Sequence, residues 1–379
     1  LKPLGFKAES AGVAAVRDRV GGAMLQALVD KVTQWFPWTP TAQVVMLAVR
    51  YDTSDETQHE KFLEDFRSRI QCTYRSGMTT PLAVVGGKQI DSDSGWGCML
   101  RVLQMMLAQC FVDIAMGREW RYRDDADIAP DSIYRQIVSC FLDTPQAPFS
   151  VHRLVDAGRS LLGKEPSTWF GPTSAARAAG HLFEQTSQGG EGEGLPESLQ
   201  GLACAVFEDG PIFENVVLEK FSAGARGVVV LVCRRLGLDA VDLDEYRPGL
   251  EACFELPEFQ GLASGNASSS AHYFVGTHGS DQLVYLDPHR TLPAVETLAP
   301  DAPLDELGLR PPRPLALRWS RLNPSVCLGF TARSPDAFRA LCTRLREGSL
   351  GKVFEVMDRP PSYGHRGEET VDEDLVLLG

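Results

Sequence analysis

One long apolar run constrains how this chain of 379 residues can fold more than any other stretch. Residues 99–114 are apolar on several sides of a helix, with Leu100, Val102, Leu103, Met105, Met106, Leu107, Phe111 and Ile114. A helix of this kind has to be buried nearly all round. Just before it, Asp93 and Ser94 offer N-cap side chains, and a glycine-rich turn follows. The pattern predicts a buried helix that begins at Cys98.

Cys98 itself is a candidate nucleophile. A thiol in the first turn of a helix faces backbone N–H groups and the positive end of the helix dipole. This environment favours the thiolate, which is the reactive form. If only its position is considered, Cys98 is more easily explained as a buried structural cysteine, one of nine cysteines in the chain. However, Gly95 and Gly97 remove side chains from the approach to the sulfur, which favours a reactive thiol.

The composition excludes several classes of function. The net charge of −13 argues against a nucleic-acid-binding protein, which needs a basic surface. The cysteine count is odd and no CxxC occurs, which indicates free thiols in a reducing compartment rather than disulfides or a zinc site. No apolar run reaches the length of a membrane span, and we expect no signal peptide. We therefore expect a cytoplasmic protein without a metal or cofactor.

The hydrophobic periodicity changes along the chain. It predicts helices over 11–34, 56–70, 131–142, from Ser150 onward, and over 172–184 and 334–347. It predicts strands over 44–51, 202–207, 227–233, 271–275, 283–286, 327–331 and 353–357. Residues 244–254 contain Pro248-Gly249 and indicate a turn with at most a short helix. A helix-rich first half that holds the thiol thus precedes a strand-rich second half.

A cysteine nucleophile needs a base, and His289 is the best placed of the seven histidines. It follows an expected strand in Tyr285-Leu-Asp-Pro-His289, where residues i and i+2 point to the same side. Asp287 and His289 can therefore face one site, with Pro288 stiffening the link between them. A carboxylate beside an imidazole stabilises the imidazolium, which in turn holds a thiolate. The alternative is a turn after a strand followed by a surface histidine.

The remaining candidates are weaker. His272 lies in an apolar strand and is expected to be a core residue or a residue that supports the site. The other five histidines are expected to lie at the surface or to have structural roles. The backbone N–H of Cys98 is one candidate oxyanion donor. Tyr74 lies before the glycine-rich turn, but its spacing alone does not distinguish it from the other tyrosines.

Five stretches in order resemble the autophagins, the cysteine proteases of autophagy that process ubiquitin-like modifiers of the GABARAP type. They are FLEDFRSRI with TYR at 62–75, GWGCMLR with QMMLAQ at 95–109, FSVHRL with WFGP at 149–172, AHYFVG at 271–276 and YLDPH at 285–289. The resemblance spans about residues 60–345. It implies an α/β (α+β) papain-like cysteine protease fold, with a central helix that carries the nucleophile and a small extra lobe.

The resemblance also implies roles for individual residues. Cys98 would be the nucleophile, His289 the general base and Asp287 its orienting carboxylate, and the Tyr74 hydroxyl would help to form the oxyanion hole. Trp169 matches the aromatic residue over the entrance to the cysteine. Residues 267–270, with Ser268 and Ser269, match the loop that covers the entrance, although the family usually has Gly-Gly and Pro there.

The implied reaction is cleavage of the modifier after its C-terminal glycine and its release from phosphatidylethanolamine. The partners would be the modifier as substrate and, transiently, the membrane that carries it; we expect a monomer. We expect a divergent N-terminal helical segment over 1–50, a catalytic domain over 51–357 with an exposed insertion loop over 187–199, and a mobile acidic tail over 358–379. Two alternatives stay open: another papain-like thiol hydrolase, such as a deubiquitinase, and a non-catalytic adaptor that only binds the modifier.

Overall fold

A mixed β-sheet forms the middle layer of the molecule. The computed structural model describes residues 43–122, 129, 132–187, 194–208, 210–266 and 270–360. Within them, the large sheet has the strand order β13-β11-β10-β9-β14-β8-β6, and β1 and β2 extend it beside β10. Its strands are β1 Gln43–Met46, β2 Val49–Asp52, β6 Leu202–Glu208, β8 Gly227–Arg235, β9 Phe259–Asn266, β10 Ala271–His278, β11 Gln282–Leu286, β13 Leu315–Arg318 and β14 Leu322–Ala332. Neighbouring strands are antiparallel except β6 and β8, which are parallel.

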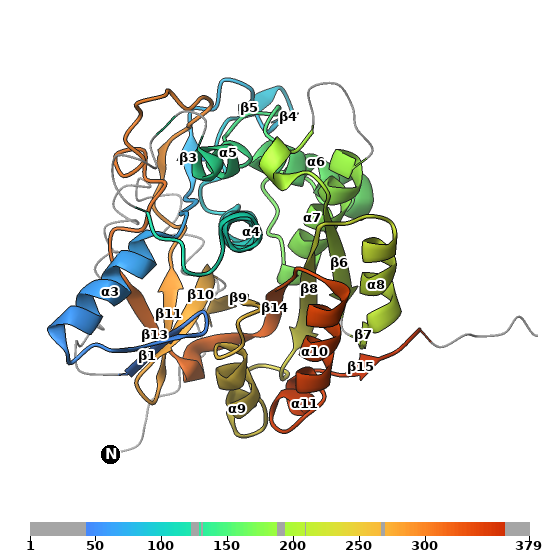
Figure 1. The fold of residues 1–379 in the computed structure, drawn as a ribbon. Helices are drawn as coiled ribbons and strands as arrows, with labels where there is room; N and C mark the ends of the chain where they lie inside the picture. Colours follow the sequence, from blue (N-terminus) through green and yellow to red (C-terminus); the bar gives the residue numbers. More distant parts are fainter. Residues whose placement is uncertain are drawn as a thin grey trace, which may run out of the picture.

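Helices cover both faces of this sheet (Figure 1). One face carries α4 Cys98–Met116, α5 Ile133–Ser139, α6 Val151–Leu162 and α7 Pro172–Ser187. The other carries α8 Glu214–Ser222, α9 Leu243–Cys253, α10 Pro335–Leu345 and α11 Leu350–Val353. Along β8, Val229 and Leu231 belong to the first core and Val228 and Val230 to the second. Two-sided burial explains why this strand is apolar throughout.

Helix α4 is the predicted central helix and begins at Cys98 as expected. All its residues from Cys98 to Asp113 are buried. Contrary to the prediction that no apolar run reaches the length of a span, α4 is long and apolar enough to cross a membrane. Of its most apolar window of 18 residues, 89% is buried inside the protein, as is typical of a core helix. The predicted cap is also wrong: the N-cap is Gly97, without a side-chain hydrogen bond.

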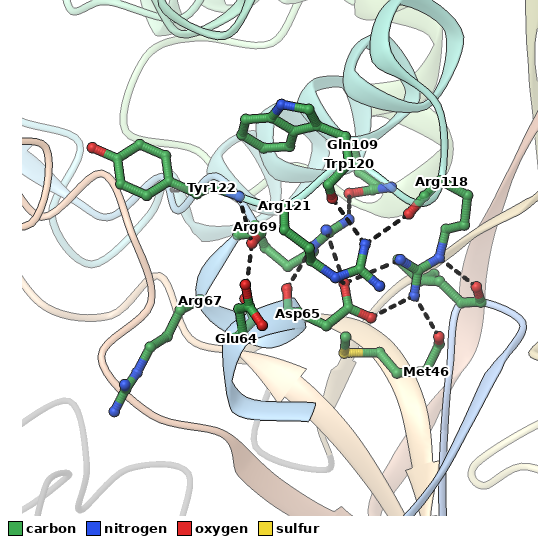
Figure 2. A network of polar contacts seen from close by, with 12 residues as sticks. Met46, Glu64, Asp65, Arg67, Arg69, Gln109, Arg118, Trp120, Arg121 and Tyr122 are labelled. Carbon is green, nitrogen blue, oxygen red and sulfur yellow. Dashed lines mark hydrogen bonds and ion pairs between the residues drawn. The ribbon is translucent and has the colours of Figure 1, made fainter. Parts of the chain in front are cut away.

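The opposite end of α4 is fixed by a buried polar network around Asp65 of α3 Glu56–Arg67 (Figure 2). Asp65 is fully buried and pairs with Arg69, Arg118 and Arg121 at 3.1, 2.7 and 3.2 Å. Arg118 also donates to the carbonyl oxygens of Met46, the last residue of β1, and of Leu47, in the turn between β1 and β2. The network therefore ties α3, the end of α4 and the first hairpin together.

Several boundaries differ from the prediction. The strand expected over 44–51 is a hairpin, because Leu47 and Ala48 adopt positive φ angles and reverse the chain. This hairpin joins the main sheet through β10, so residues 43–50, which were expected to belong to an N-terminal helical segment, are not helical. The helix predicted over 11–34 lies outside the described residues.

Three further expectations need correction. Residues 243–253 form helix α9 with Pro248 inside it, where a turn was expected. The exposed loop predicted over 187–199 does not extend to its end, because Leu195 and Leu199 are buried. The last expected strand is reduced to β15 Val356–Met357, preceded by α11. The acidic tail lies outside the described residues from 361 onward.

Three small sheets complete the fold. They pair β3 Arg75–Ser76 with β12 Leu292–Pro293, β4 Ala83–Val85 with β5 Lys88–Ile90, and β7 Ile212–Phe213 with β15. The β3–β12 pair is parallel, with Arg75 opposite Leu292. It brings the segment before the glycine-rich turn alongside the segment after β11, although more than two hundred positions separate them in the sequence.

Candidate active site

The Cys98 sulfur lies where three parts of the chain meet. Cys98 is the first residue of α4 and only 3% exposed. The His289 imidazole, the Tyr74 hydroxyl and the backbone N–H of Ala271 all interact with its sulfur and favour the thiolate. As the first residue of a helix, Cys98 also has a backbone N–H without an intrahelical acceptor. The structure therefore surrounds the thiol with groups that stabilise negative charge.

Asp287 and His289 form the expected pair. Nδ1 of His289 contacts Oδ1 of Asp287, and the His289 backbone N–H donates to the same oxygen at 3.0 Å. Nε2 of His289 is left free to interact with Cys98, and it has no hydrogen-bond partner among the described residues. Asp287 thus fixes the imidazole in the orientation that a general base for Cys98 requires.

Backbone hydrogen bonds hold Tyr74 beside this pair. The Tyr74 N–H donates to the carbonyl oxygen of Pro288 at 2.8 Å, and the Leu292 N–H donates to the Tyr74 carbonyl at 3.0 Å. The side chain of Gln71 donates to the Asp287 carbonyl at 2.9 Å. The Tyr74 ring meets the His289 ring edge-on, with centroids 5.5 Å apart. These contacts single out Tyr74, which sequence spacing alone did not.

The pKa shifts describe a thiolate–imidazolium pair. Burial opposes charge on both groups, but their mutual hydrogen bond and attraction lower the pKa of Cys98 and, with Asp287, raise that of His289 to about 10. Burial would raise the pKa of Asp287, yet His289 and the nearby His272 lower it to about 2. Burial and the neighbouring Cys98 raise the pKa of Tyr74, so its hydroxyl stays protonated and can donate. These shifts favour the thiolate–imidazolium form of the pair over the neutral form.

A buried ionic cluster beneath the site was missed by the sequence reasoning. Asp93 accepts from Nε of Arg101 at 2.6 Å and from the Arg75 N–H at 2.7 Å. Arg101 also pairs with Asp143 at 2.8 Å, and the Asp143 side chain accepts from the Val295 N–H at 2.8 Å. These contacts join β3, the turn before Cys98 and the first turn of α4. The available signal was a buried arginine inside a mostly apolar helix.

His272 lies against the catalytic pair. It is 4% exposed, and its ring centroid is 5.2 Å from that of His289 and 4.6 Å from that of Tyr285. Burial lowers its pKa to about 4 despite the nearby Asp287, so the ring is neutral at pH 7. This placement agrees with the expected core or supporting residue. His272, Asp287 and His289 are also the described residues that come close enough together to hold a metal ion.

For the other predicted site residues, Trp169, Ser268 and Ser269, the described part of the structure gives no contact with the Cys98 sulfur. Trp169 is 44% exposed on the loop between α6 and α7, and its carbonyl oxygen accepts from Lys164 at 3.1 Å. Ser268 and Ser269 lie outside the described residues. Their roles at the entrance stay predictions.

Sequence comparison now decides the family. Residues 59–344 match the family model of the peptidase C54 catalytic domain. The chain belongs to the peptidase C54 family. It is a cysteine protease, and the matched range contains all the residues assembled around the sulfur.

Relatives from fungi are similar over most of the chain. The "Probable cysteine protease atg4" of Sclerotinia sclerotiorum is 31% identical, over 96% of this chain and 85% of its own length. The "Probable cysteine protease ATG4" of Coccidioides immitis is 33% identical, over 82% and 74%. The "Probable cysteine protease atg4" of Penicillium rubens is 32% identical, over 84% and 82%. The similarity thus extends well beyond the motifs around the thiol.

Proposed function

We propose that this C54 protease acts in autophagy and cleaves a ubiquitin-like modifier of the GABARAP type after its C-terminal glycine. The same activity would release the modifier from phosphatidylethanolamine, because both bonds are amides of that glycine. The observation that carries the proposal is the assembly of Cys98, His289, Asp287 and Tyr74 from three distant segments of a chain whose relatives are ATG4-type proteases.

The first half of the reaction uses the thiolate and the imidazolium. The Cys98 thiolate attacks the carbonyl carbon of the glycine, and negative charge moves to the carbonyl oxygen. The Cys98 N–H and the Tyr74 hydroxyl are the donors positioned to stabilise this oxyanion. The C–N bond then breaks as His289 gives its proton to the leaving amine, which leaves a thioester on Cys98.

The second half regenerates the enzyme. His289, now neutral, takes a proton from a water molecule as that water attacks the thioester carbonyl. The C–S bond breaks, the modifier leaves with a free carboxylate, and the thiolate–imidazolium pair forms again. Asp287 keeps the imidazole oriented through both proton transfers.

Specificity for glycine requires a slot without room for a Cβ. We assign the walls of this slot to Trp169 and to residues 267–270, including Ser268 and Ser269. The exposed indole of Trp169 agrees with a residue that meets substrate rather than core. We further propose a papain-like arrangement with a small extra lobe, a catalytic domain that ends near residue 357, and a cytoplasmic monomer that meets the membrane only through its substrate.

A precursor-cleavage assay tests the proposal. The wild type is incubated with a GABARAP-type precursor, and mass spectrometry locates the cut. We expect cleavage after the C-terminal glycine, and none with Cys98→Ala. Cys342→Ala, a buried cysteine of α10 on the far face of the sheet, serves as the matched control and should keep its activity.

Two results would favour the alternatives. Cleavage of a fluorogenic ubiquitin substrate, without cleavage of the precursor, would indicate a deubiquitinase. Binding of the modifier without turnover would indicate an adaptor. Unchanged cleavage by Cys98→Ala would refute the assigned nucleophile.

A further inference from the structure

We propose that Asp93 is a positioning residue of this protease, and that its buried carboxylate holds the Tyr74 hydroxyl in place relative to the Cys98 sulfur. One oxygen of the carboxylate binds the segment that carries Tyr74, and the other binds the helix that begins at Cys98. The inference rests on the proposed role of Tyr74 as an oxyanion donor, and it assigns the residue that fixes this donor.

Oδ1 of Asp93 fixes the main chain next to Tyr74. It accepts from the backbone N–H of Arg75 at 2.7 Å, and this N–H belongs to the peptide group that joins Tyr74 to Arg75. The Asp93 N–H donates to the Arg75 carbonyl oxygen at 3.3 Å, and the Ser92 hydroxyl donates to the same oxygen at 2.8 Å. The carbonyl oxygen of Tyr74 accepts from the Leu292 N–H at 3.0 Å. The peptide group after Tyr74 is therefore held at both of its polar ends.

Oδ2 of Asp93 fixes the first turn of α4. It accepts from Nε of Arg101 at 2.6 Å, and both side chains are buried. Hydrogen bonds between ionised groups are shorter and stronger than bonds between neutral groups. The Asp93 carbonyl oxygen also accepts from the Gly97 N–H at 2.8 Å. One residue thus links the helix of the nucleophile to the segment of the oxyanion donor.

Gly97 makes room for this carboxylate. A Cβ added to Gly97 would lie 2.7 Å from both the Cβ and Oδ2 of Asp93. A larger residue at position 97 would therefore have to displace Asp93 or the turn that leads to Cys98. The glycine before the nucleophile thus serves the packing of Asp93 as well as the approach to the sulfur.

The charge of Asp93 is balanced nearby, which favours a positioning role over a direct electrostatic effect on Cys98. Arg101 pairs with Asp93 at 2.6 Å and with Asp143 at 2.8 Å. Arg75 lies 3.8 Å from Asp143. Two carboxylates therefore face two arginines, and this cluster has no net charge.

Steady-state kinetics on the modifier precursor give the first test. Asp93→Asn keeps the main-chain contacts of residue 93, but its amide group cannot accept from both Arg75 and Arg101. We expect kcat to fall roughly 10–10²-fold with little change in KM, because a misplaced donor fails mainly in the transition state. In a Tyr74→Phe background the same substitution should lower kcat less than about 3-fold, since the donor that Asp93 positions is already gone.

Alkylation of Cys98 by iodoacetamide gives a second test that needs no substrate. Burial raises the pKa of Cys98, whereas the titratable groups His289 and Tyr74, which interact with its sulfur, lower it. Mass spectrometry follows the alkylation rate of Cys98 over a pH series, which gives the pKa of the thiol. The shift in this pKa caused by Asp93→Asn should be more positive in the wild type than in Tyr74→Phe. Any direct effect of the Asp93 charge is common to both backgrounds and cancels.

Arg101→Lys covers the case in which Asp93→Asn fails to fold. Lysine keeps the positive charge but lacks the planar fork with which Arg101 binds Asp93 and Asp143. It should therefore loosen the carboxylate without changing the charge of the cluster. The same dependence on Tyr74 is expected in both measurements.

Asp113→Asn is the matched control. Asp113 is a buried carboxylate of the same helix, α4, but lies toward its opposite end. It accepts from the Thr331 hydroxyl at 2.7 Å and pairs with Arg333 at 3.0 Å. Its substitution should change neither kcat nor the pKa of Cys98.

Two results would overturn the proposal. One is that the effects of Asp93→Asn and Tyr74→Phe simply add in both measurements. The other is that Asp93→Asn is as active as Asp113→Asn. If the wild type does not cleave the precursor, the proposed function fails, and the alkylation profiles alone decide whether Asp93 positions Tyr74.

Discussion

Tyr74 acts on the reactive sulfur through a single hydroxyl group. It donates to Cys98, and its backbone is fixed by Pro288 and Leu292. Tyr74→Phe removes the donor but keeps the ring against His289. We expect kcat to fall roughly 10²-fold with little change in KM, because an oxyanion donor acts mainly in the transition state. Steady-state kinetics on the modifier precursor measure both constants.

The same variant should raise the pKa of Cys98, because one of the groups that lower it is lost. The acid limit of the pH–activity profile would move to higher pH. Tyr134→Phe is the control, since the Tyr134 hydroxyl is buried without a partner among the described residues. Equal kinetics for the Tyr74 and Tyr134 variants would remove Tyr74 from the oxyanion hole.

We expect Asp287 to set the alkaline limit of activity through His289. Its hydrogen bond is the strongest influence that raises the pKa of His289, to about 10. With Asp287→Asn this pKa falls, so the imidazolium is lost at lower pH and the alkaline limit of kcat/KM moves downward. We expect kcat to drop roughly 10²–10⁴-fold. A pH profile recorded from acid to alkaline conditions tests the direction of the shift.

Asp281→Asn provides the comparison for this profile. Asp281 is an exposed carboxylate that precedes β11 and pairs only weakly, at 3.7 and 3.9 Å, with Arg247 and Arg318. Its removal should leave the profile unchanged. An unmoved alkaline limit in Asp287→Asn would mean that another group governs His289.

At the level of single residues, the sequence predicted the Asp287–His289 pair but not the buried ionic contacts of Asp93 beneath the site. Asp287 and His289 are two positions apart, so strand geometry was enough to place them together. Asp93 was expected to cap α4, yet it binds Arg75 and Arg101. The ionic partners of a buried carboxylate depend on segments far away in the sequence, and local patterns carry no information about them.

At the level of elements, burial decided which predictions succeeded. Helix α4 and strand β8 are apolar on all sides because each is covered on all sides, and both were predicted. Helix α9 was missed because Pro248 and Gly249 look like a turn. In the fold, Gly249 packs closely on Ser349, the N-cap of α11, and an added Cβ would lie 2.4 Å from the Ser349 carbonyl oxygen, so close packing rather than a turn explains this glycine.

Close packing of α4 on the sheet gives an element-level prediction. Gly329 of β14 faces Met106 of α4, and a Cβ added to Gly329 would lie 2.7 Å from the Met106 sulfur. Gly329→Ala should therefore reduce the free energy of unfolding by about 1–3 kcal/mol through overpacking. Urea unfolding measures this change. Gly194→Ala, where an added Cβ meets nothing within 4 Å, should be close to neutral.

A double-mutant cycle separates crowding from other causes. If the clash with Met106 is responsible, the effects of Gly329→Ala and Met106→Ala will not add, because the smaller side chain leaves room for the new methyl group. Additive effects would show that the cost arises elsewhere in the strand.

At the level of the whole molecule, long-range pairings limited the prediction. The sequence indicated helices first and strands second, and it indicated that the thiol and its base come from different halves. It did not show that the β1–β2 hairpin returns to β10. Nor did it show that one carboxylate would anchor α3, α4 and this hairpin together. Such pairings depend on the complete three-dimensional arrangement.

That carboxylate, Asp65, makes the stability of the whole fold depend on pH. Burial would raise its pKa, but Arg69 and Arg118 lower it below the usual value, and Tyr51 donates to it at 2.7 Å. A depressed folded-state pKa contributes stability that is present above the unfolded pKa of about 3.9. This contribution is lost as the pH falls through the folded pKa. Acid should therefore loosen the end of α4 that lies opposite Cys98.

Asp65→Asn should reduce the free energy of unfolding by about 3–5 kcal/mol at pH 7, because three arginines lose their shared counter-charge. The variant should also lose less stability than the wild type as the pH falls below about 4, since the titrating group is gone. Urea unfolding at neutral and acidic pH measures both effects. Asp156→Asn, at an exposed pair on α6, should behave like the wild type. An Asp65→Asn variant as stable as Asp156→Asn would mean that α4 is held by apolar packing alone.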